Sequence, residues 1–402
     1  MEIRSTTEKD LDVLVETVHA AFGRFPETPA EDGGGVWWSA IEPERGLLAV
    51  APDGRPVGTA GAYSFELTLP GGAVTPVSGV SYVGVLPTHR RQGVLTAMMR
   101  RQLADLRARG EFLSVLLASE PVIYGRFGYG PATYTGRLTV PRRRAALAAP
   151  RAGAAATGSV EVLRRADCQD LLEELYDRYR RAQPGALSRP HRWWARRAGQ
   201  PPVTAAPRYI ALHRDADGAP DGYASYSLDG STLTVDETIA VDDAVTSALT
   251  RFLLGHDLVE QVVFKHFPAE HPLRWQLADF GAAQVGNSTE WLWVRLLDVP
   301  RALTARGWLT DGELVLDVDD PFLGERARHL LTVRDGRAEC VPTDREPDLS
   351  LDVRDLGAVY LGGTPVSTLV RAGHIRAHRP EAAALADALF RAERTPHCLN
   401  WF

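Results

Sequence analysis

The order of apolar and polar positions predicts a mixed α and β fold for the first third of the chain. Apolar residues recur at helical spacing from Leu11 to Phe22, directly after a capping segment at residues 7–10. The apolar residues between 95 and 106 form one face of a further helix. Runs typical of strands lie at 46–51, 56–69, 74–86, 113–118 and 134–140. This order of a helix, antiparallel strands and a strand–loop–helix–strand unit predicts an α+β domain over residues 1–144.

The remainder of the chain predicts two more domains. Residues 145–159 (AALAAPRAGAAATGS) hold almost no side chains that could build a core, which is typical of a linker. Beyond them the order of predicted helices and strands partly repeats that of the first domain. This repetition indicates a second copy of the same fold over residues 145–297. Alternating strands and two short helices then predict a separate, smaller α+β domain over residues 298–402.

Composition narrows the class of protein. The 402-residue chain has a net charge of −6, which argues against a general nucleic-acid-binding protein. Three widely spaced cysteines argue against a disulfide framework. We find no signal peptide and no apolar run of membrane-spanning length, so we expect a cytoplasmic protein without a membrane span. The eleven histidines show no ligand spacing, and no metal site is expected.

The most informative segment is a predicted strand-to-helix turn at residues 87–95 (PTHRRQGVL). Free amides at a helix N-terminus carry partial positive charge, and Gly93 lets the backbone approach phosphate oxygens closely. Arg90 and Arg91 add charge-assisted hydrogen bonds. These features predict the binding of a coenzyme A thioester, and therefore acyl transfer. The turn resembles the [RQ]-x-x-G-x-[GA] pattern of GNAT acetyltransferases at Arg90 and Gly93, and departs from it at Leu95.

The predicted second copy of the fold lacks this turn. The sequence AVDD at residues 240–243 stands between its central strand and the following helix, and contains neither glycine nor arginine. It cannot cradle a phosphate in the same way. We therefore expect the second copy to be structural, with one active site per chain.

A second motif, ASEPVIYGRFGYG, occupies residues 118–130. In GNAT enzymes, which this region resembles, a short helix at this place carries a tyrosine that protonates the leaving CoA thiolate. A phenol with a pKa of about 10 is protonated at neutral pH and can donate that proton. Tyr124 and Tyr129 are both candidates. For Tyr129, packing of the turn is favoured over a catalytic role.

The segments THRRQGVL and IYGRFGYGPAT, with two acyltransferase-like halves and a third domain, resemble the Eis (enhanced intracellular survival) family over essentially the whole chain. The resemblance implies tandem GNAT domains, the first active and the second degenerate, and a C-terminal sterol-carrier-protein-like domain. It also implies an acetyl-CoA-dependent N-acetyltransferase that assembles as a homo-hexamer. Some Eis-like proteins acetylate aminoglycoside antibiotics at several amines, a basis of antibiotic resistance.

The same resemblance assigns roles to residues of this chain. The backbones of Val83 and Val85 would pair with the pantetheine arm, and Ser119 would lie near the cofactor. Tyr124 would be the general acid, and the α-carboxylate of the last residue, Phe402, would be the general base. The residues expected to hold the phosphates are Arg90, Arg91, Gly93 and Val94.

These motifs leave the acceptor amine open. Arg24 and Trp401 argue against a polycation as the substrate, because aminoglycoside-acetylating relatives have an acidic pocket and neither residue is acidic. Aminoglycosides, other polyamines and lysine side chains all remain candidates. For Trp37, packing within a helix is an equal alternative to a pocket role. The competing class is a non-catalytic protein, an acyl-CoA- or lipid-binding regulator or scaffold. The predicted substrate-pocket residues are Phe22, Arg24, Trp37, Tyr82 and Trp401.

Overall fold

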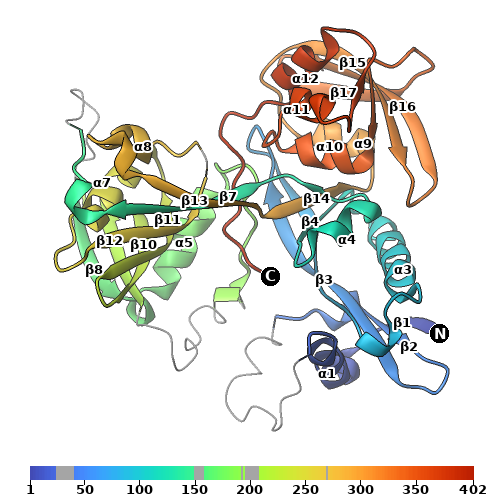
Figure 1. Ribbon diagram of the computed structural model, residues 1–402, viewed down its shortest axis with the longest axis horizontal. Helices are drawn as coiled ribbons and strands as arrows, with labels where there is room; N and C mark the ends of the chain where they lie inside the picture. Colours follow the sequence, from blue (N-terminus) through green and yellow to red (C-terminus); the bar gives the residue numbers. More distant parts are fainter. Residues whose placement is uncertain (24–39, 149–157, 192, 195–207, 269) are drawn as a thin grey trace. The chain divides into compact units, whose positions relative to one another are not determined.

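The computed structural model of the protein describes residues 1–23, 40–148, 158–191, 193–194, 208–268 and 270–402. These residues form two compact units, each built from separate stretches of the chain (Figure 1). Unit 1 comprises Met1–Thr133, Trp291–Pro396 and Asn400–Phe402, and unit 2 comprises Tyr134–Glu290 and His397–Leu399. In the described part of the chain, no helix combines the length and the apolar character that crossing a membrane requires.

The first sheet of unit 1 has seven strands in the order β1-β2-β3-β4-β5-β14-β6. The pair β4 and β5 is parallel, and the other neighbouring pairs in this sheet are antiparallel. The strands predicted between residues 46 and 118 are thereby confirmed. The strands are β1 (Glu2–Ser5), β2 (Gly46–Val50), β3 (Pro56–Thr68), β4 (Val74–Val85), β5 (Leu113–Leu117), β6 (Gly130–Pro131) and β14 (Leu292–Leu296).

The helices α1 (Leu11–Ala21) and α3 (Val94–Ala108) cover opposite faces of this sheet (Figure 1). A Cβ on Gly84 of β4 would lie 2.8 Å from Ala21 of α1, and one on Gly58 of β3 would lie 3.1 Å from Met98 of α3. Gly84 pairs with Thr59, the neighbour of Gly58, and successive strand residues point to opposite faces. The apolar periodicity that predicted both helices therefore corresponds to the faces that they bury.

The C-terminal part of unit 1 forms a smaller α+β domain, as predicted. Its sheet has the order β17-β16-β15-β18-β19. The helix α10 (Val353–Tyr360) lies against β14 of the first sheet, because a Cβ on Gly357 would lie only 2.3 Å from the carbonyl oxygen of Val294. The other elements are α9 (Val299–Ala305), β15 (Gly312–Asp320), β16 (Glu325–Arg334), β17 (Arg337–Pro342), β18 (Leu349–Asp352), α11 (Val366–Arg371), β19 (Arg376–Ala377) and α12 (Ala382–Phe390).

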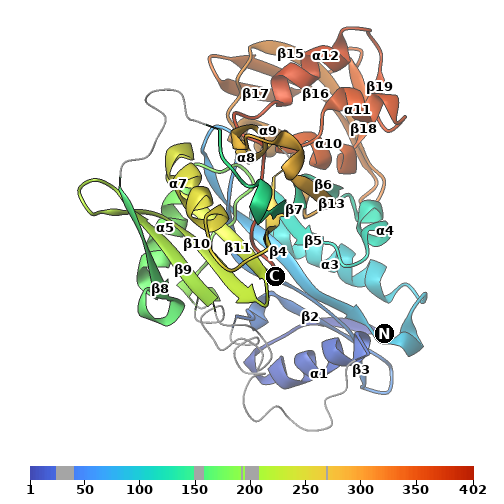
Figure 2. The same cartoon turned by 60° about the vertical axis from the view of Figure 1, so that its left-hand side comes forward.

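Unit 2 repeats the topology of the first sheet, as the repeated order of elements predicted. Its sheet runs β13-β7-β12-β11-β10-β9-β8, and β11 and β12 form its parallel pair. The helices α5 (Gln169–Arg180) and α7 (Asp243–Leu254) pack on alternate residues of β9, and so on opposite faces (Figure 2). The remaining elements are β7 (Tyr134–Pro141), β8 (Ser159–Arg164), β9 (Arg208–Arg214), β10 (Pro220–Asp229), β11 (Thr232–Ala240), β12 (Gln261–Phe267), α8 (Leu273–Gln276) and β13 (Gln284–Glu290).

The strands β7 and β14 each pair in a different sheet from the one that the predicted domain boundaries assign to them. The strand β7 falls in the predicted first domain, 1–144, yet it pairs with β12 and β13 of unit 2. Conversely, β14 falls in the predicted second domain, 145–297, yet it pairs with β5 and β6 of unit 1. The apolar pattern predicts that a segment is a strand but carries no information about its partner, so the boundaries at 144 and 297 miss this exchange.

Candidate active site

The centre of the first sheet opens where β4 and β5 separate. The two strands pair only from Ser78 to Val80 of β4, opposite residues 114–116 of β5. Beyond this point β5 continues along β14, and β4 continues along β3 to Val85. Among the described residues, the part of β4 that contains Val83 and Val85 therefore has no partner in β5. This opening offers main-chain groups to an extended ligand arm, in the place where the sequence predicts pantetheine binding.

A bulge in β4 lies beside the opening. Gly61 of β3 is opposite Ser81, and Thr59 is opposite Gly84, so β4 holds one extra residue between these pairs. Tyr82, within the bulge, has a left-handed backbone with φ of 40°. The hydroxyl of Thr59 donates a hydrogen bond of 2.7 Å to the carbonyl oxygen of Tyr82 and holds this conformation. A non-glycine residue in this region of φ is uncommon and is often found at functional sites.

The turn after β4 leaves the N-terminus of α3 open. Gly93, the N-cap residue, has φ of 80°, and no side chain caps the helix. A Cβ on Gly93 would meet nothing within 4 Å, so the approach to these amides is clear. Arg91 is exposed and also has a left-handed backbone, with φ of 62°. Val94 starts the helix and is buried. The turn thus presents uncapped amides in an arrangement suited to a phosphate.

The side chain of Arg90, which the sequence predicts to hold the phosphates, forms hydrogen bonds within the protein instead. Its guanidinium donates to two main-chain carbonyls, that of Val85 at 3.2 Å and that of Ala21 at 2.7 Å. The side chain therefore ties the end of β4 to the end of α1. In this arrangement Arg90 shapes the turn, although both it and Arg91 are exposed residues.

Tyr124 lies at the end of the short helix α4 (Pro121–Tyr124), which follows β5. Its side chain is buried, and this burial raises the pKa of its hydroxyl to about 12. Among the described residues no group forms a hydrogen bond with that hydroxyl. Ser119, in the bend before α4, is exposed.

Tyr129 differs from Tyr124 in its surroundings. The two rings meet edge to face with 6.3 Å between their centroids. The Tyr129 hydroxyl is fully buried and shares a hydrogen bond of 2.8 Å with the hydroxyl of Ser114 in β5. Burial raises the pKa of Tyr129 to about 12 as well, and the hydrogen bond from Ser114 opposes this shift. The arrangement supports packing as the role of Tyr129.

Four aromatic rings form a continuous row, here called the aromatic row, from the bulge to the last residue of the chain. The centroid distances are 5.6 Å from Tyr82 to Tyr63, 6.0 Å from Tyr63 to Phe65, and 5.1 Å from Phe65 to Phe402. Tyr63 and Phe65 belong to β3 and, two residues apart, lie on one face of the sheet. Sequence reasoning found Tyr82 and Phe402 but missed the two residues between them, although their period-two spacing was visible.

Two features hold the chain end in unit 1. The indole of Trp291 donates a hydrogen bond of 3.0 Å to the carbonyl oxygen of Asn400. Phe402 is buried, and a Cβ on Gly79 of β4 would lie 3.0 Å from its ring, so the absent side chain makes room for it. Trp401 is 56% exposed. The last residue is thus fixed on the sheet that carries the bulge.

The predicted acceptor pocket is described in part. Phe22, which ends α1, is 57% exposed, and the hydroxyl of Tyr82 is buried without a partner among the described residues. Burial, together with the neighbouring phenol of Tyr63 and the carboxylate of Glu42, raises the pKa of Tyr82 well above its usual value. The other two predicted pocket residues, Arg24 and Trp37, lie outside the described residues.

The equivalent helix of unit 2 is closed to an anion. Asp242 is the N-cap of α7, and its carboxylate accepts a hydrogen bond of 2.8 Å from the amide of Val245. A negative side chain thus occupies the position that the first copy leaves open. As for metals, the described residues contain no group of three or more histidine, cysteine, aspartate or glutamate side chains that could hold an ion.

Comparison with protein families finds three domain models that match successive parts of the chain. Residues 2–132 match a family model described as an acetyltransferase (GNAT) domain. Residues 185–296 match a second acetyltransferase (GNAT) domain model, and residues 299–399 match a sterol carrier protein domain. These matches confirm the predicted fold class, two GNAT domains followed by a sterol-carrier-protein-like domain.

Individual proteins are similar over almost the whole chain. An uncharacterized N-acetyltransferase of Streptomyces griseus is 38% identical over 363 residues, 87% of each chain. The N-acetyltransferase Eis of Mycobacterium tuberculosis is 36% identical over 410 residues, 97% of this chain and 96% of the relative. The crystal structure of Eis1 from Mycobacterium abscessus, 33% identical, superimposes with a TM-score of 0.87 and covers both chains completely.

Proposed function

Since this chain belongs to the Eis family of GNAT N-acetyltransferases, we propose that it transfers an acetyl group from acetyl-CoA to a primary amine at a single site in its first GNAT domain. The fold implies acetyl-CoA as the cosubstrate. The observation that carries the choice of site is the contrast between the two copies. The N-terminus of α3 is uncapped, whereas Asp242 caps that of α7.

The residues of the first copy fit the parts of acetyl-CoA in order. The amides of Gly93 and Val94, with the side chain of Arg91, hold the phosphates. Main-chain groups of Val83 and Val85 face the opening between β4 and β5 and hold the pantetheine arm. Arg90 positions the turn through its two carbonyl partners. Bound in this way, acetyl-CoA presents its thioester carbonyl near the bulge, and Ser119 lies near the cofactor.

Two groups of the chain move protons in the proposed reaction. The α-carboxylate of Phe402 accepts a proton from the acceptor ammonium, which frees the nitrogen lone pair. The nitrogen attacks the acetyl carbon, a C–N bond forms and the C–S bond breaks, and the nitrogen then gives up its second proton through solvent, which restores the phenol of Tyr124 after that phenol has protonated the thiolate. Tyr124 donates its proton to the departing thiolate sulfur. Its pKa of about 12 keeps the phenol protonated at neutral pH, so it is ready to act as an acid.

The aromatic row supports an acceptor site on the face of the sheet that carries Tyr82 and Phe402. An ammonium group is attracted to the faces of aromatic rings, and the carboxylate of Phe402 adds a single negative charge. Phe22 and Trp401, both more than half exposed, complete the described part of the proposed pocket. Aminoglycosides, other polyamines and lysine side chains are the candidate acceptors. We further propose a cytoplasmic homo-hexamer, by analogy with the family.

A CoA-release assay with a panel of amines tests this function. The panel contains aminoglycosides, spermidine, simple arylalkylamines and lysine-containing peptides, each with acetyl-CoA at saturation. We expect release of CoA with at least one amine, and loss of release in Tyr124→Phe. If acetyl-CoA binds in a calorimeter but no amine is acetylated, the chain is a non-catalytic acyl-CoA-binding protein. Analytical ultracentrifugation tests the hexamer separately.

A further inference from the structure

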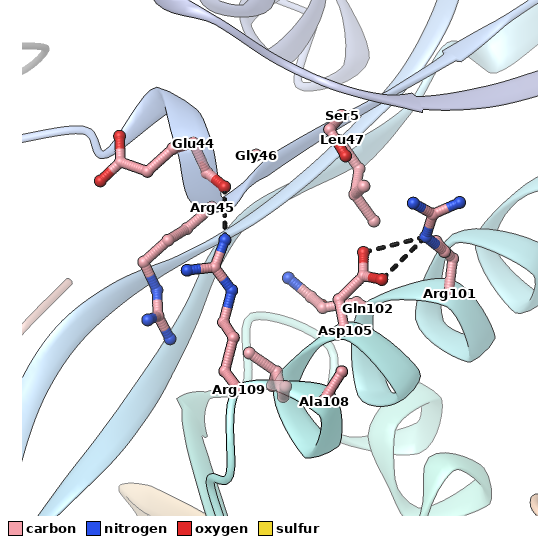
Figure 3. A pocket seen from close by; sticks show the side chains of 11 residues that line it. Ser5, Glu44, Arg45, Gly46, Leu47, Arg101, Gln102, Asp105, Ala108 and Arg109 are labelled. Atoms are coloured by element: carbon pink, nitrogen blue, oxygen red, sulfur yellow. Dashed lines mark hydrogen bonds and ion pairs between the residues drawn. The ribbon is translucent and has the colours of Figure 1, made fainter.

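A polar cavity of about 340 Å³ lies in unit 1 beside the C-terminal half of α3 (Figure 3). Its lining residues come from α3 and the residue after it, from the 3-10 turn Pro43–Arg45, and from β1 and β2, and none of them belongs to the active site proposed above. Those that carry polar or charged groups into the argument are Glu44, Arg45, Arg101, Gln102, Asp105 and Arg109.

Two buried polar groups on this cavity have no partner among the described residues. Gln102 is only 3% exposed, and neither its amide nitrogen nor its amide oxygen forms a hydrogen bond there. The Nε of Arg45 is buried and unpartnered in the same sense. Most buried polar groups in proteins are hydrogen-bonded. A buried amide whose N–H and C=O groups both have no partner therefore indicates a ligand that can both accept and donate a hydrogen bond.

The charges around the cavity compensate one another in pairs. The carboxylate of Asp105 accepts hydrogen bonds of 2.9 and 3.0 Å from the Nε of Arg101, one helical turn before it. The guanidinium of Arg45 pairs with the carboxylate of Glu111 at 2.6 Å. Figure 3 shows the first of these pairs at the edge of the cavity. Neither pair leaves a net charge for a ligand to neutralise.

Arg109 is the exception. In the described part of the chain its guanidinium donates only to the main-chain carbonyl of Glu44, at 2.7 Å. Figure 3 shows the Glu44 carboxylate turned away from that guanidinium, and the Gln102 side chain extending from α3 between Arg109 and Asp105. In the described part of the chain, the cavity therefore combines an exposed cation and an exposed carboxylate that form no ion pair, Arg109 and Glu44, with the unpaired buried amide of Gln102.

We propose that this cavity binds a small carboxylate that carries a hydroxyl or amino group on the neighbouring carbon. The ligand carboxylate pairs with the guanidinium of Arg109. Its neighbouring hydroxyl or amino group donates to the amide oxygen of Gln102, and an oxygen of the ligand accepts from the amide nitrogen. A cavity of this volume holds a molecule of this size together with water, and is too small for coenzyme A.

Thermal unfolding and titration calorimetry of the full chain test the proposal with L-lactate, glycolate and glycine as probes, and with acetate and inorganic phosphate for comparison. At least one of the three 2-substituted carboxylates should raise the unfolding midpoint by several degrees at millimolar concentration, and more than acetate does. Arg109→Met and Gln102→Leu should each weaken its binding at least about tenfold. Gln102→Leu should unfold no earlier than the parent without ligand, because it removes an unpaired buried amide.

The matched control is Arg55→Met, which removes an exposed arginine at a turn of the same unit and should bind the probe like the parent. The proposal is overturned if no probe binds at millimolar concentration, in which case the cavity holds only water. It is equally overturned if both Arg109→Met and Gln102→Leu bind the probe as the parent does. Acetyl transfer is not a readout here, so the outcome is independent of the proposed enzyme activity.

Discussion

The ring of Phe402, the last residue of the chain, packs against the ring of Phe65 in β3 at an interplanar angle of 62°. Gly79 in the neighbouring strand provides the space for this contact. Because the ring is buried against the sheet, we expect the α-carboxylate of the same residue to be held on the face that carries Tyr82. A flexible chain end would offer no such fixed base, so the proposed proton transfer depends on this packing.

Extension of the chain by one glycine after Phe402 tests the carboxylate. The ring keeps its place, while the carboxylate moves by one residue, about 3.8 Å. We expect kcat to fall on the order of 100-fold, with acetyl-CoA affinity unchanged. Phe402→Leu, which keeps the carboxylate and reduces only the packing, should lose less activity than the extension. Full activity in a folded extended protein would exclude the carboxylate as the base.

Replacement of Tyr124 by phenylalanine tests the acid. The variant keeps the buried ring and removes the proton donor, so kcat should fall on the order of 100-fold while calorimetry shows normal acetyl-CoA binding. Tyr129→Phe is the matched control. It should lose about 1 kcal/mol of stability with the hydrogen bond to Ser114 and keep its turnover. Reversed results would assign the acid role to Tyr129.

Alkaline pH should destabilise the first domain through its two buried phenols. The pKa values of Tyr124 and Tyr129 are raised to about 12 in the fold, from 10.0 in the absence of burial. The unfolded chain therefore loses these protons first, so the stabilisation is complete below pH 10 and is lost as the pH rises towards 12. Urea unfolding at a series of pH values measures the slope. Tyr124→Phe should lower the alkaline slope, and an unchanged slope would contradict the raised pKa.

Gly61→Ala should damage the site without touching a proposed catalytic group. A Cβ at this position would lie 2.0 Å from the ring of Tyr82, which must then move away from the bulge. We expect kcat/KM to fall at least about tenfold, because small displacements of positioned groups are costly in catalysis. In the control Gly136→Ala in β7, the nearest atoms to the new Cβ are 3.5 Å away. Equal kinetics in the two variants would remove Tyr82 from the acceptor site.

Asp242→Ala tests the assignment of the second copy as structural. The variant loses the cap of α7 and should be less stable by about 1 kcal/mol, measured by chemical denaturation. Its acetylation kinetics should match those of the parent. A change in the KM for acetyl-CoA would indicate that the second copy takes part in cosubstrate binding.

Local patterns in the sequence predict the elements of this fold well. The apolar spacing in α1 and α3 corresponds to their buried faces, and the contrast between the turn at Gly93 and the acidic cap at Asp242 is visible in the sequence. The bulge at Tyr82 is not visible. Its left-handed backbone arises in a residue that usually avoids it, and what stabilises it is a hydrogen bond from Thr59, on a neighbouring strand.

The features of the site that the sequence does not predict depend on contacts between residues that are distant in sequence. The side chain of Arg90 looks like a phosphate ligand in the motif, but the end of α1 brings the carbonyl of Ala21 within its reach. The aromatic row likewise joins residues of β3 with the chain end, which only the folded sheet brings together. The proposed catalytic roles of Tyr124 and Phe402 remain predictions for the experiments above.

The exchange of β7 and β14 has a consequence for the synthesis of the protein. The catalytic sheet is interrupted after Thr133, and its sixth strand, β14, leaves the ribosome only after the whole of Tyr134–Glu290 has been made. A chain that stops before Leu296 therefore cannot complete this sheet, and the first acetyltransferase domain reaches its full fold only after the second has been synthesised.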